Sequence, residues 1–306
     1  MLLLLPCFAQ RAGLIDLQIC DRDEYNDAMR NRLLLAAQKL SNFLVPLAAV
    51  AILVAFLNIA PPGILSDADA IGYAVCHRLD SHSFDIAGRQ LPLCARCTGM
   101  YLGAVIGLVF LSLRYGRSTG RPSKGVIAIL VLFFLAFAVD GSNSYLTLMK
   151  SVYGGRLNFI PDLYQPNNTL RLFTGSGVGL GMAVAIFSAF NQTFWQNWDD
   201  KRILGKPWDF VILIAVMMGI DLLVLPEWDW TLYPLALVSS GGVLLLLTMV
   251  YSMLWTMFVR QENQFMRLGQ AWLPILAGLT ITLLQITTID VVRLWLTHTW
   301  GGFPLG

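Results

Sequence analysis

Residues 43–61 read FLVPLAAVAILVAFLNIAP and include no charged side chain. About 20 apolar residues are enough to cross the hydrocarbon core of a bilayer as an α-helix. Lipid offers no hydrogen-bond partners to the backbone, so a helix is the state that such a stretch adopts in a membrane. The segment therefore predicts a transmembrane helix.

The same composition extends along the 306-residue chain. Hydrophobic residues make up 56% of it and charged residues 13%, whereas ordinary soluble domains are roughly 25% charged. This composition excludes a disordered chain, a coiled coil and an ordinary soluble enzyme. Six further apolar stretches predict membrane spans: 98–113, 125–140, 172–190, 208–225, 232–258 and 271–297. We therefore expect an all-α fold, a polytopic integral membrane bundle of about seven helices in the cell membrane.

The lysines and arginines of the connecting loops predict the orientation of the bundle. They are densest in 114–124, 191–207 and 259–270, which lie on one side if there are seven spans. The side whose short loops carry more lysine and arginine is cytoplasmic. We therefore expect a cytoplasmic N-terminus and an extracytoplasmic loop over residues 62–97, which folds over the outer mouth of the bundle.

Residues 1–42 are expected to form a cytoplasmic N-terminal segment, and 43–306 the transmembrane helical domain. Within the first segment, 21–42 resembles an amphipathic helix. Asp21 can cap it, and Glu24 follows three residues later as in a capping box. Such a helix lies along the membrane interface before the first span, or it packs without a role of its own. Its apolar face contains Leu33, Leu34, Ala37 and Leu40.

The loop 62–97 concentrates rare side chains. It holds Cys76, His77, His82, Cys94 and Cys97, which are three of the five cysteines and two of the three histidines. Cys94 and Cys97 form a C-x-x-C pair, whose spacing lets two thiolates turn toward one metal ion. Cys76 and His77 lie about 17 residues upstream, a separation typical of two half-sites. Thiolate and imidazole together suit zinc, so Cys76, His77, Cys94 and Cys97 are the predicted metal ligands.

The fourth ligand stays open in this prediction. Cys76 and His77 are adjacent, and binding one ion through both requires an awkward backbone geometry. Alternatively, one of the two only supports the other ligands, and His82, Asp80 or Asp85 completes the site.

Two other interpretations of the cysteines compete with a metal site. A C-x-x-C pair at the start of a helix has a lowered thiol pKa and is typical of thiol–disulfide exchange, and the outer face of a membrane is oxidising. Alternatively, Cys94 and Cys97 form part of a structural disulfide that leaves a spare thiol. Cys7 and Cys20 fall on the predicted cytoplasmic side and are expected to be unpaired.

The cysteine segment resembles a known family. Cys76-His77, Ser83-Phe84 and the stretch PLCARCTGMYLG at 92–103 are similar to the signature of the DUF2085 family, which comprises predicted polytopic membrane proteins of bacteria and archaea with no established activity. The family usually has arginine where this chain has His82. The resemblance therefore counts against His82 as an inherited ligand.

A second part of that family pattern also occurs in this chain. It consists of Asp140-Gly141, followed by Asn168-x-x-Arg171-x-x-Thr174-Gly175. Together the two parts cover about residues 70–182. The resemblance implies a membrane protein, and it implies no reaction.

Several ionisable residues fall within the predicted spans, where they are costly and are candidates for function. In a seven-span bundle all of them lie toward the outer ends of their helices, on the side of the cysteine loop. This shared depth predicts one composite site in the outer leaflet. The residues are Asp140, Arg171, Asp221, Asp290 and Arg293.

Each of these residues also has a structural interpretation. Asp290 and Arg293 are three residues apart, so they can form an ion pair within one helix. Arg171 can bind a lipid phosphate without taking part in catalysis. Asp140 is predicted to end the third span, where Gly141 permits a tight turn, and it can be a metal ligand, a general base or a partner of His77.

Glycines at helical spacing predict close helix packing. Small residues let membrane helices approach one another. The two stripes contain Gly99, Gly103 and Gly107 in the second span, and Gly175, Gly177, Gly179 and Gly181 in the fourth.

The predicted function is a zinc site that serves a metal-dependent enzyme, a hydrolase or a transferase acting on a lipid-like substrate. The metal would activate water, Asp140 would act as the base and Arg171 would hold an anionic headgroup. The net charge of +2 provides no field for nucleic acid, so the expected partner is the lipid bilayer. The number of subunits does not follow from the sequence.

Three alternatives to this enzyme stay open. If all four ligands bind, the zinc is structural and the protein is a scaffold or a subunit of a complex. If Cys94 and Cys97 cycle between dithiol and disulfide, the protein is a membrane thiol–disulfide oxidoreductase. If Asp221, Asp290 and Arg293 line a path, it is a transporter.

Overall fold

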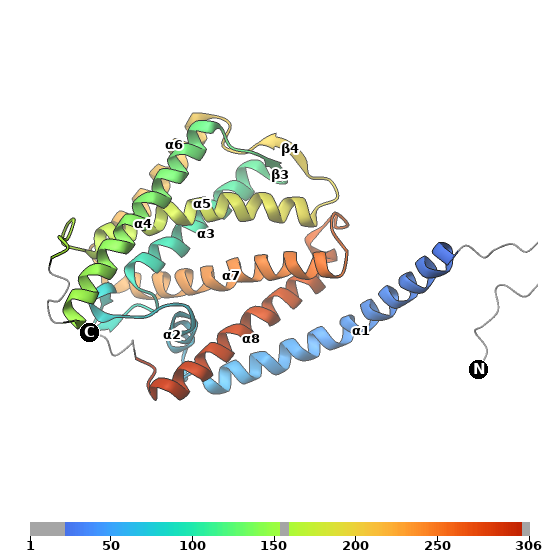
Figure 1. Cartoon of the computed structure of the whole chain (residues 1–306), viewed down its shortest axis with the longest axis horizontal. Helices are drawn as coiled ribbons and strands as arrows, with labels where there is room; N and C mark the ends of the chain where they lie inside the picture. Colours follow the sequence, from blue (N-terminus) through green and yellow to red (C-terminus); the bar gives the residue numbers. More distant parts are fainter. Residues whose placement is uncertain (1–21, 154–158, 302–306) are drawn as a thin grey trace, which may run out of the picture. The chain divides into compact units, whose positions relative to one another are not determined.

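A computed structural model of the chain describes residues 22–153 and 159–301, with side chains from residue 39 onward (Figure 1). The chain divides into two compact units, Met1–Asn42 and Phe43–Gly306. In the first unit the described residues are helical. Leu33, Leu34 and Ala37, on which the amphipathic interpretation depends, lie outside the described side chains. The site described below belongs to the second unit.

Eight α-helices account for most of the described residues. Their bounds are α1 (Arg22–Ile59), α2 (Ile64–Val75), α3 (Ala95–Tyr115), α4 (Lys124–Val152), α5 (Asn168–Phe194), α6 (Pro207–Val224), α7 (Leu232–Phe258) and α8 (Trp272–Thr297). All except α2 contribute a segment that is long and apolar enough to cross a membrane, which makes seven candidate spans within the described residues. The protein is therefore a multi-pass membrane protein, and the prediction of about seven helices is confirmed.

The prediction that the third span ends at Asp140 is wrong. Helix α4 continues to Val152, and Gly141 lies inside it rather than in a tight turn. The polar residues beyond Gly141 stay helical because the segment before α5 folds back over them. The Asn143 amide donates to the carbonyl oxygen of Tyr164 at 2.9 Å and accepts from the Leu163 amide at 2.9 Å.

Residues 62–97 are folded rather than an irregular loop. They contain α2, a 3-10 turn η1 (Asp80–His82), and an antiparallel hairpin of β1 (Asp85–Ile86) and β2 (Arg89–Gln90). Ala87 and Gly88 join the two strands with φ angles of 56° and 72°. Two consecutive positive φ angles are characteristic of a type I′ hairpin turn. Helix α2 packs against α7 and α8, so it attaches this segment to one end of the bundle.

Helices α3 and α5 make the most extensive contact in the bundle (Figure 1). A Cβ added at Gly99 would overlap the carbonyl oxygen of Leu172, and one added at Gly175 would overlap the carbonyl oxygen of Arg96. Gly103 and Gly179 face the opposite backbone in the same way. The prediction that these glycines permit close helix packing is confirmed.

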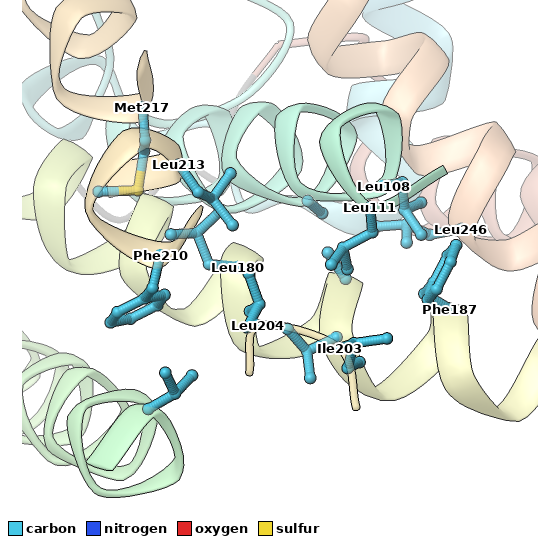
Figure 2. Packing of buried hydrophobic residues seen from close by; sticks show 14 residues of the cluster. Leu108, Leu111, Leu180, Phe187, Ile203, Leu204, Phe210, Leu213, Met217 and Leu246 are labelled. Atoms are coloured by element: carbon cyan, nitrogen blue, oxygen red, sulfur yellow. The ribbon is translucent and has the colours of Figure 1, made fainter. Parts of the chain in front are cut away.

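The opposite end of the bundle is closed by a second pair of short strands. After α3, β3 (Ser118–Gly120) pairs in parallel with β4 (Asp199–Arg202), which follows α5. Ile203 and Leu204 come next and are completely buried. Figure 2 shows them among the apolar side chains of α3, α5 and α6, including Leu111, Leu180 and Leu213. The basic loops 114–124 and 191–207 therefore lie at one end, and which side of the membrane this end faces stays a prediction.

Candidate metal centre

Three cysteine side chains come together where α2 ends and α3 begins. Cys76 is the C-cap of α2, Cys94 is the N-cap of α3, and Cys97 lies in the first turn of α3. Their Sγ atoms all lie within 4.8 Å of one another. All three are free thiols, and Cys76 and Cys94 are only 6% and 2% exposed. The structure thus brings together three of the four predicted ligands.

The segment that carries Cys76 is fixed by a helix far along the chain. The guanidinium of Arg293 on α8 donates to the carbonyl oxygens of Tyr73 and Cys76, the latter at 2.6 Å. It also lies 3.9 Å from the centre of the Tyr73 ring. On the other side, the backbone amide of Cys94 donates to the Cys76 sulfur at 3.3 Å. Both contacts hold Cys76 toward the start of α3.

The three thiols differ in how readily they lose a proton. Hydrogen bonds from the thiols of Cys94 and Cys97 lower the pKa of Cys76 well below its usual value, although burial acts in the opposite direction. The bond that the Cys94 thiol donates to Cys76 raises the pKa of Cys94 to about 12. The cluster therefore favours the thiolate at Cys76, which is the form that binds metals.

His77 lies beside the cluster without belonging to it. Its Nδ1 is 3.9 Å from the Cys76 sulfur, and its Nε2 is 3.2 Å from Nδ1 of His82. The metal-ligand group found within the described residues contains the three cysteines and no histidine or carboxylate. Burial, followed by the charge of Arg171, lowers the pKa of His82 to about 4, so His82 is neutral at neutral pH.

Asp140 is held in an ion pair that the sequence did not indicate. The Asp140 carboxylate is 1% exposed. It accepts from Nε of Arg96 at 3.1 Å, from Nη2 of the same residue, and from the hydroxyl of Tyr164 at 2.8 Å. Burial, together with this hydrogen bond, raises the pKa of Tyr164 to about 12. Arg96 stands inside the C-x-x-C motif, so Asp140 anchors the turn that presents Cys94 and Cys97.

Arg171 is also directed at the cysteine segment. It is 4% exposed, and its Nη1 donates to the carbonyl oxygen of Ser81 at 3.2 Å and to the side chain of Asn168 at 2.8 Å. The amide of Asn168 in turn donates to the carbonyl oxygen of Ser83 at 3.0 Å. The start of α5 therefore holds residues 81–83 in place.

A family comparison covers the segment just described. The model of the family described as "Predicted membrane protein (DUF2085)" matches residues 76–185. An uncharacterized protein of Methanothermobacter thermautotrophicus is 31% identical over 110 residues, which are 36% of this chain and 82% of that protein. The chain belongs to the DUF2085 family. An uncharacterized protein of Methanocaldococcus jannaschii is 25% identical over 129 residues, 42% of this chain and 71% of that protein. No solved structure matches.

The DUF2085 segment contains all three thiols, and also Arg96, Asp140 and Arg171. Arg293 lies outside the matched residues. The three cysteines and the ion pair of Arg96 with Asp140 thus belong to the part of the chain that matches the family. Arg293, which holds the backbone of Cys76, comes from outside that part.

Two other ionisable residues of the predicted composite site are buried elsewhere. Asp221 accepts a hydrogen bond from the hydroxyl of Ser176 at 2.8 Å. Asp290 is 1% exposed. Neither of them belongs to the close ion pairs found within the described residues, and the pair of Asp290 with Arg293 stays a prediction. The cysteine cluster and the ion pair of Arg96 with Asp140 therefore involve neither of these two carboxylates.

Two cavities meet at His77. One, of about 470 Å³, lies between the end of α2 and α8 and is lined mainly by apolar side chains. The other, of about 450 Å³, lies between the cysteine segment and α4, and its lining includes His82 and Arg96. Cys76 itself lines the first cavity, so the cysteine cluster borders this cavity directly.

Proposed function

We propose that this DUF2085 protein binds one zinc ion through Cys76, Cys94 and Cys97 at the extracytoplasmic end of its helix bundle. The observation that carries the proposal is the grouping of three buried free thiols, from two separate segments, within 4.8 Å of one another. Around a tetrahedral zinc ion with bonds of about 2.3 Å, the sulfurs are about 3.7 Å apart. Small side-chain movements bring the cluster to that spacing.

Three protein ligands leave a fourth position, as in catalytic zinc sites. We propose that water occupies it and that His77, 3.9 Å from the Cys76 sulfur and hydrogen-bonded to His82, takes up the proton of that water. Bound zinc supplies the Lewis acidity that makes water nucleophilic at neutral pH. In this proposal Asp140 is a positioning residue rather than the base, because Arg96 and Tyr164 occupy its carboxylate. The reaction class is a hydrolysis or group transfer on a lipid-like substrate.

The metal content of the purified protein tests this proposal. Elemental mass spectrometry of protein prepared without chelator is expected to find about one zinc per chain. The double variant Cys94→Ser, Cys97→Ser is expected to retain none, because serine provides no thiolate. Cys7→Ser, Cys20→Ser is the matched control and should keep the metal. Wild-type protein that contains no metal would contradict the zinc proposal.

Arg293 provides a second prediction, since it holds the backbone of Cys76 in place. Arg293→Met removes the donor to the carbonyl oxygens of Tyr73 and Cys76. Groups that orient ligands typically change metal affinity by about 10–100-fold, so zinc is expected to bind that much more weakly. A competition titration with a chromogenic chelator measures this change. Arg121→Met, at an exposed position, should leave the affinity unchanged.

Thiol–disulfide exchange is the second candidate function. Cys94 caps the N-terminus of α3, and Cys97 lies in its first turn, which is where reactive C-x-x-C pairs lie, although the hydrogen bond to Cys76 raises the pKa of Cys94 to about 12. This candidate predicts a protein that lacks zinc and forms a reversible Cys94–Cys97 disulfide. It also predicts that His77→Ala leaves the reduction potential of that disulfide unchanged. The zinc proposal predicts instead that His77→Ala keeps the metal and loses the reaction.

A further inference from the structure

The cavity between the cysteine segment and α4 has a mixed lining. His77, His82 and Arg96 contribute polar groups, and Tyr145 and Leu148 of α4 contribute apolar surface. Tyr145 is 63% exposed on the surface of α4. The cavity therefore lies between His77 and an exposed part of a membrane-spanning helix.

Gly141 keeps part of Arg96 open to this cavity. Nε and Nη2 of Arg96 are engaged by Asp140 and Ser144. The remaining nitrogen, Nη1, would lie 3.8 Å from a Cβ added at Gly141. A larger side chain at position 141 would occupy the space in front of Nη1. Gly141 thus leaves a guanidinium edge facing the cavity, fixed in direction by the carboxylate behind it.

The depth of the cavity matches that of lipid headgroups. The candidate span in α4 begins at Lys124. With a rise of about 1.5 Å per residue, Gly141 lies about 26 Å along the helix axis from Lys124, and Leu148 lies further along. The hydrocarbon core of a bilayer is about 30 Å thick. The cavity therefore lies where acyl chains give way to headgroups.

The charges around the cavity favour an anion. Burial lowers the pKa of His82, and the positive charges of Arg171 and Arg96 lower it further. The one carboxylate that pairs with Arg96 in the structure is Asp140, and Arg171 donates to a carbonyl oxygen and an amide. Guanidinium groups bind phosphate oxygens well through charge-assisted hydrogen bonds.

We propose that this cavity binds a phosphate-headed lipid, with the phosphate at Arg96 Nη1 beside His77 and the acyl chains in the hydrocarbon core. This inference rests on the proposed function, since it names the substrate class of the same zinc site. It also reassigns headgroup binding from Arg171, which holds residues 81–83, to Arg96.

Native mass spectrometry tests the proposal on the full chain in detergent, titrated with dioleoyl phosphatidic acid. Gly141→Leu is expected to weaken lipid binding at least about tenfold, because it removes a charge-assisted contact and fills the cavity. The variant keeps α4 intact, since leucine is a better helix former than glycine. Gly125→Leu on the same helix, where nothing lies within 4 Å of an added Cβ, is the matched control and should bind like the wild type.

Two further measurements distinguish a lipid from free phosphate as the ligand, and the lipid proposal from the zinc proposal. Dioleoyl phosphatidylcholine, whose headgroup has no net charge, and inorganic phosphate are both expected to bind more weakly than phosphatidic acid. If Gly141→Leu binds phosphatidic acid as tightly as the wild type, the lipid does not bind in this cavity. If an equal concentration of inorganic phosphate displaces the lipid, the site recognises phosphate rather than a lipid. Zinc is counted in the same spectra, so Gly141-sensitive lipid binding by a zinc-free protein would reject the metal proposal alone.

Discussion

Gly175→Ala is expected to lower the thermal unfolding midpoint of the detergent-solubilised protein strongly. Its Cβ would overlap the carbonyl oxygen of Arg96 on the facing helix. Both partners are helix backbone, so the overlap is relieved only if α3 and α5 move apart. Overpacking of this kind costs about 3 kcal/mol or more.

Gly181→Ala on the same helix is the control for this prediction. Nothing lies within 4 Å of a Cβ at Gly181, so alanine there is expected to be neutral or to stabilise α5 by up to about 1 kcal/mol. Because Gly175 faces Arg96 of the C-x-x-C motif, Gly175→Ala is also expected to weaken zinc binding. Equal midpoints for the two variants would contradict the close approach of α3 and α5.

Asp140→Met is expected to cost about 3–5 kcal/mol, because it leaves the charge of Arg96 largely buried without its counter-ion. Arg96 is 18% exposed and Asp140 1% exposed in this ion pair. For a chain of this size the midpoint of thermal unfolding should fall by about 10 °C. Scanning fluorimetry of the detergent-solubilised protein measures the shift.

The double variant Arg96→Met, Asp140→Met distinguishes the cost of an unpaired buried charge from the cost of a changed side-chain shape. Replacing both members of a buried ion pair by apolar side chains is often neutral or stabilising, so the double variant is expected to recover most of the midpoint. A double variant as unstable as Asp140→Met would show that the hydrogen bond from Tyr164, rather than the ion pair, stabilises this end of α4.

The membrane spans could be predicted because they depend on local composition alone. A run such as 232–258 is apolar over a whole bilayer thickness, and lipid leaves helix as its only state. Close packing of α3 could be predicted for a similar reason, since Gly99 and Gly103 recur at the spacing of one helix face, although α5 as its partner could not. Neither inference requires knowledge of which helices are neighbours.

The cysteine site could be predicted in part. The C-x-x-C spacing and the rarity of cysteine pointed to Cys94, Cys97 and Cys76, which the structure brings together. Helix α2 was missed because the segment 62–97 mixes apolar residues with glycine, proline and charges, so it shows no long apolar run. Its stability comes from packing on α7 and α8, which are distant in sequence.

The partners of the charged residues could not be predicted. Arg96 was treated as a spacer within C-x-x-C, yet it pairs with Asp140 on another helix. Helical spacing indicates only Asp290 as a partner of Arg293, whereas the structure shows that Arg293 donates to the backbone at Tyr73 and Cys76. Both of these are tertiary contacts, and spacing in a single sequence carries no information about them.

The contact between Arg293 and the backbone of Cys76 has a consequence for the order in which the protein is assembled. Both cysteine segments leave the ribosome well before α8, the last of the seven candidate spans within the described residues. Until α8 has entered the bilayer, the residue that steadies the turn before the first thiol is missing. For the zinc site proposed above, firm capture of the ion is therefore expected late in biogenesis, once the membrane domain is complete.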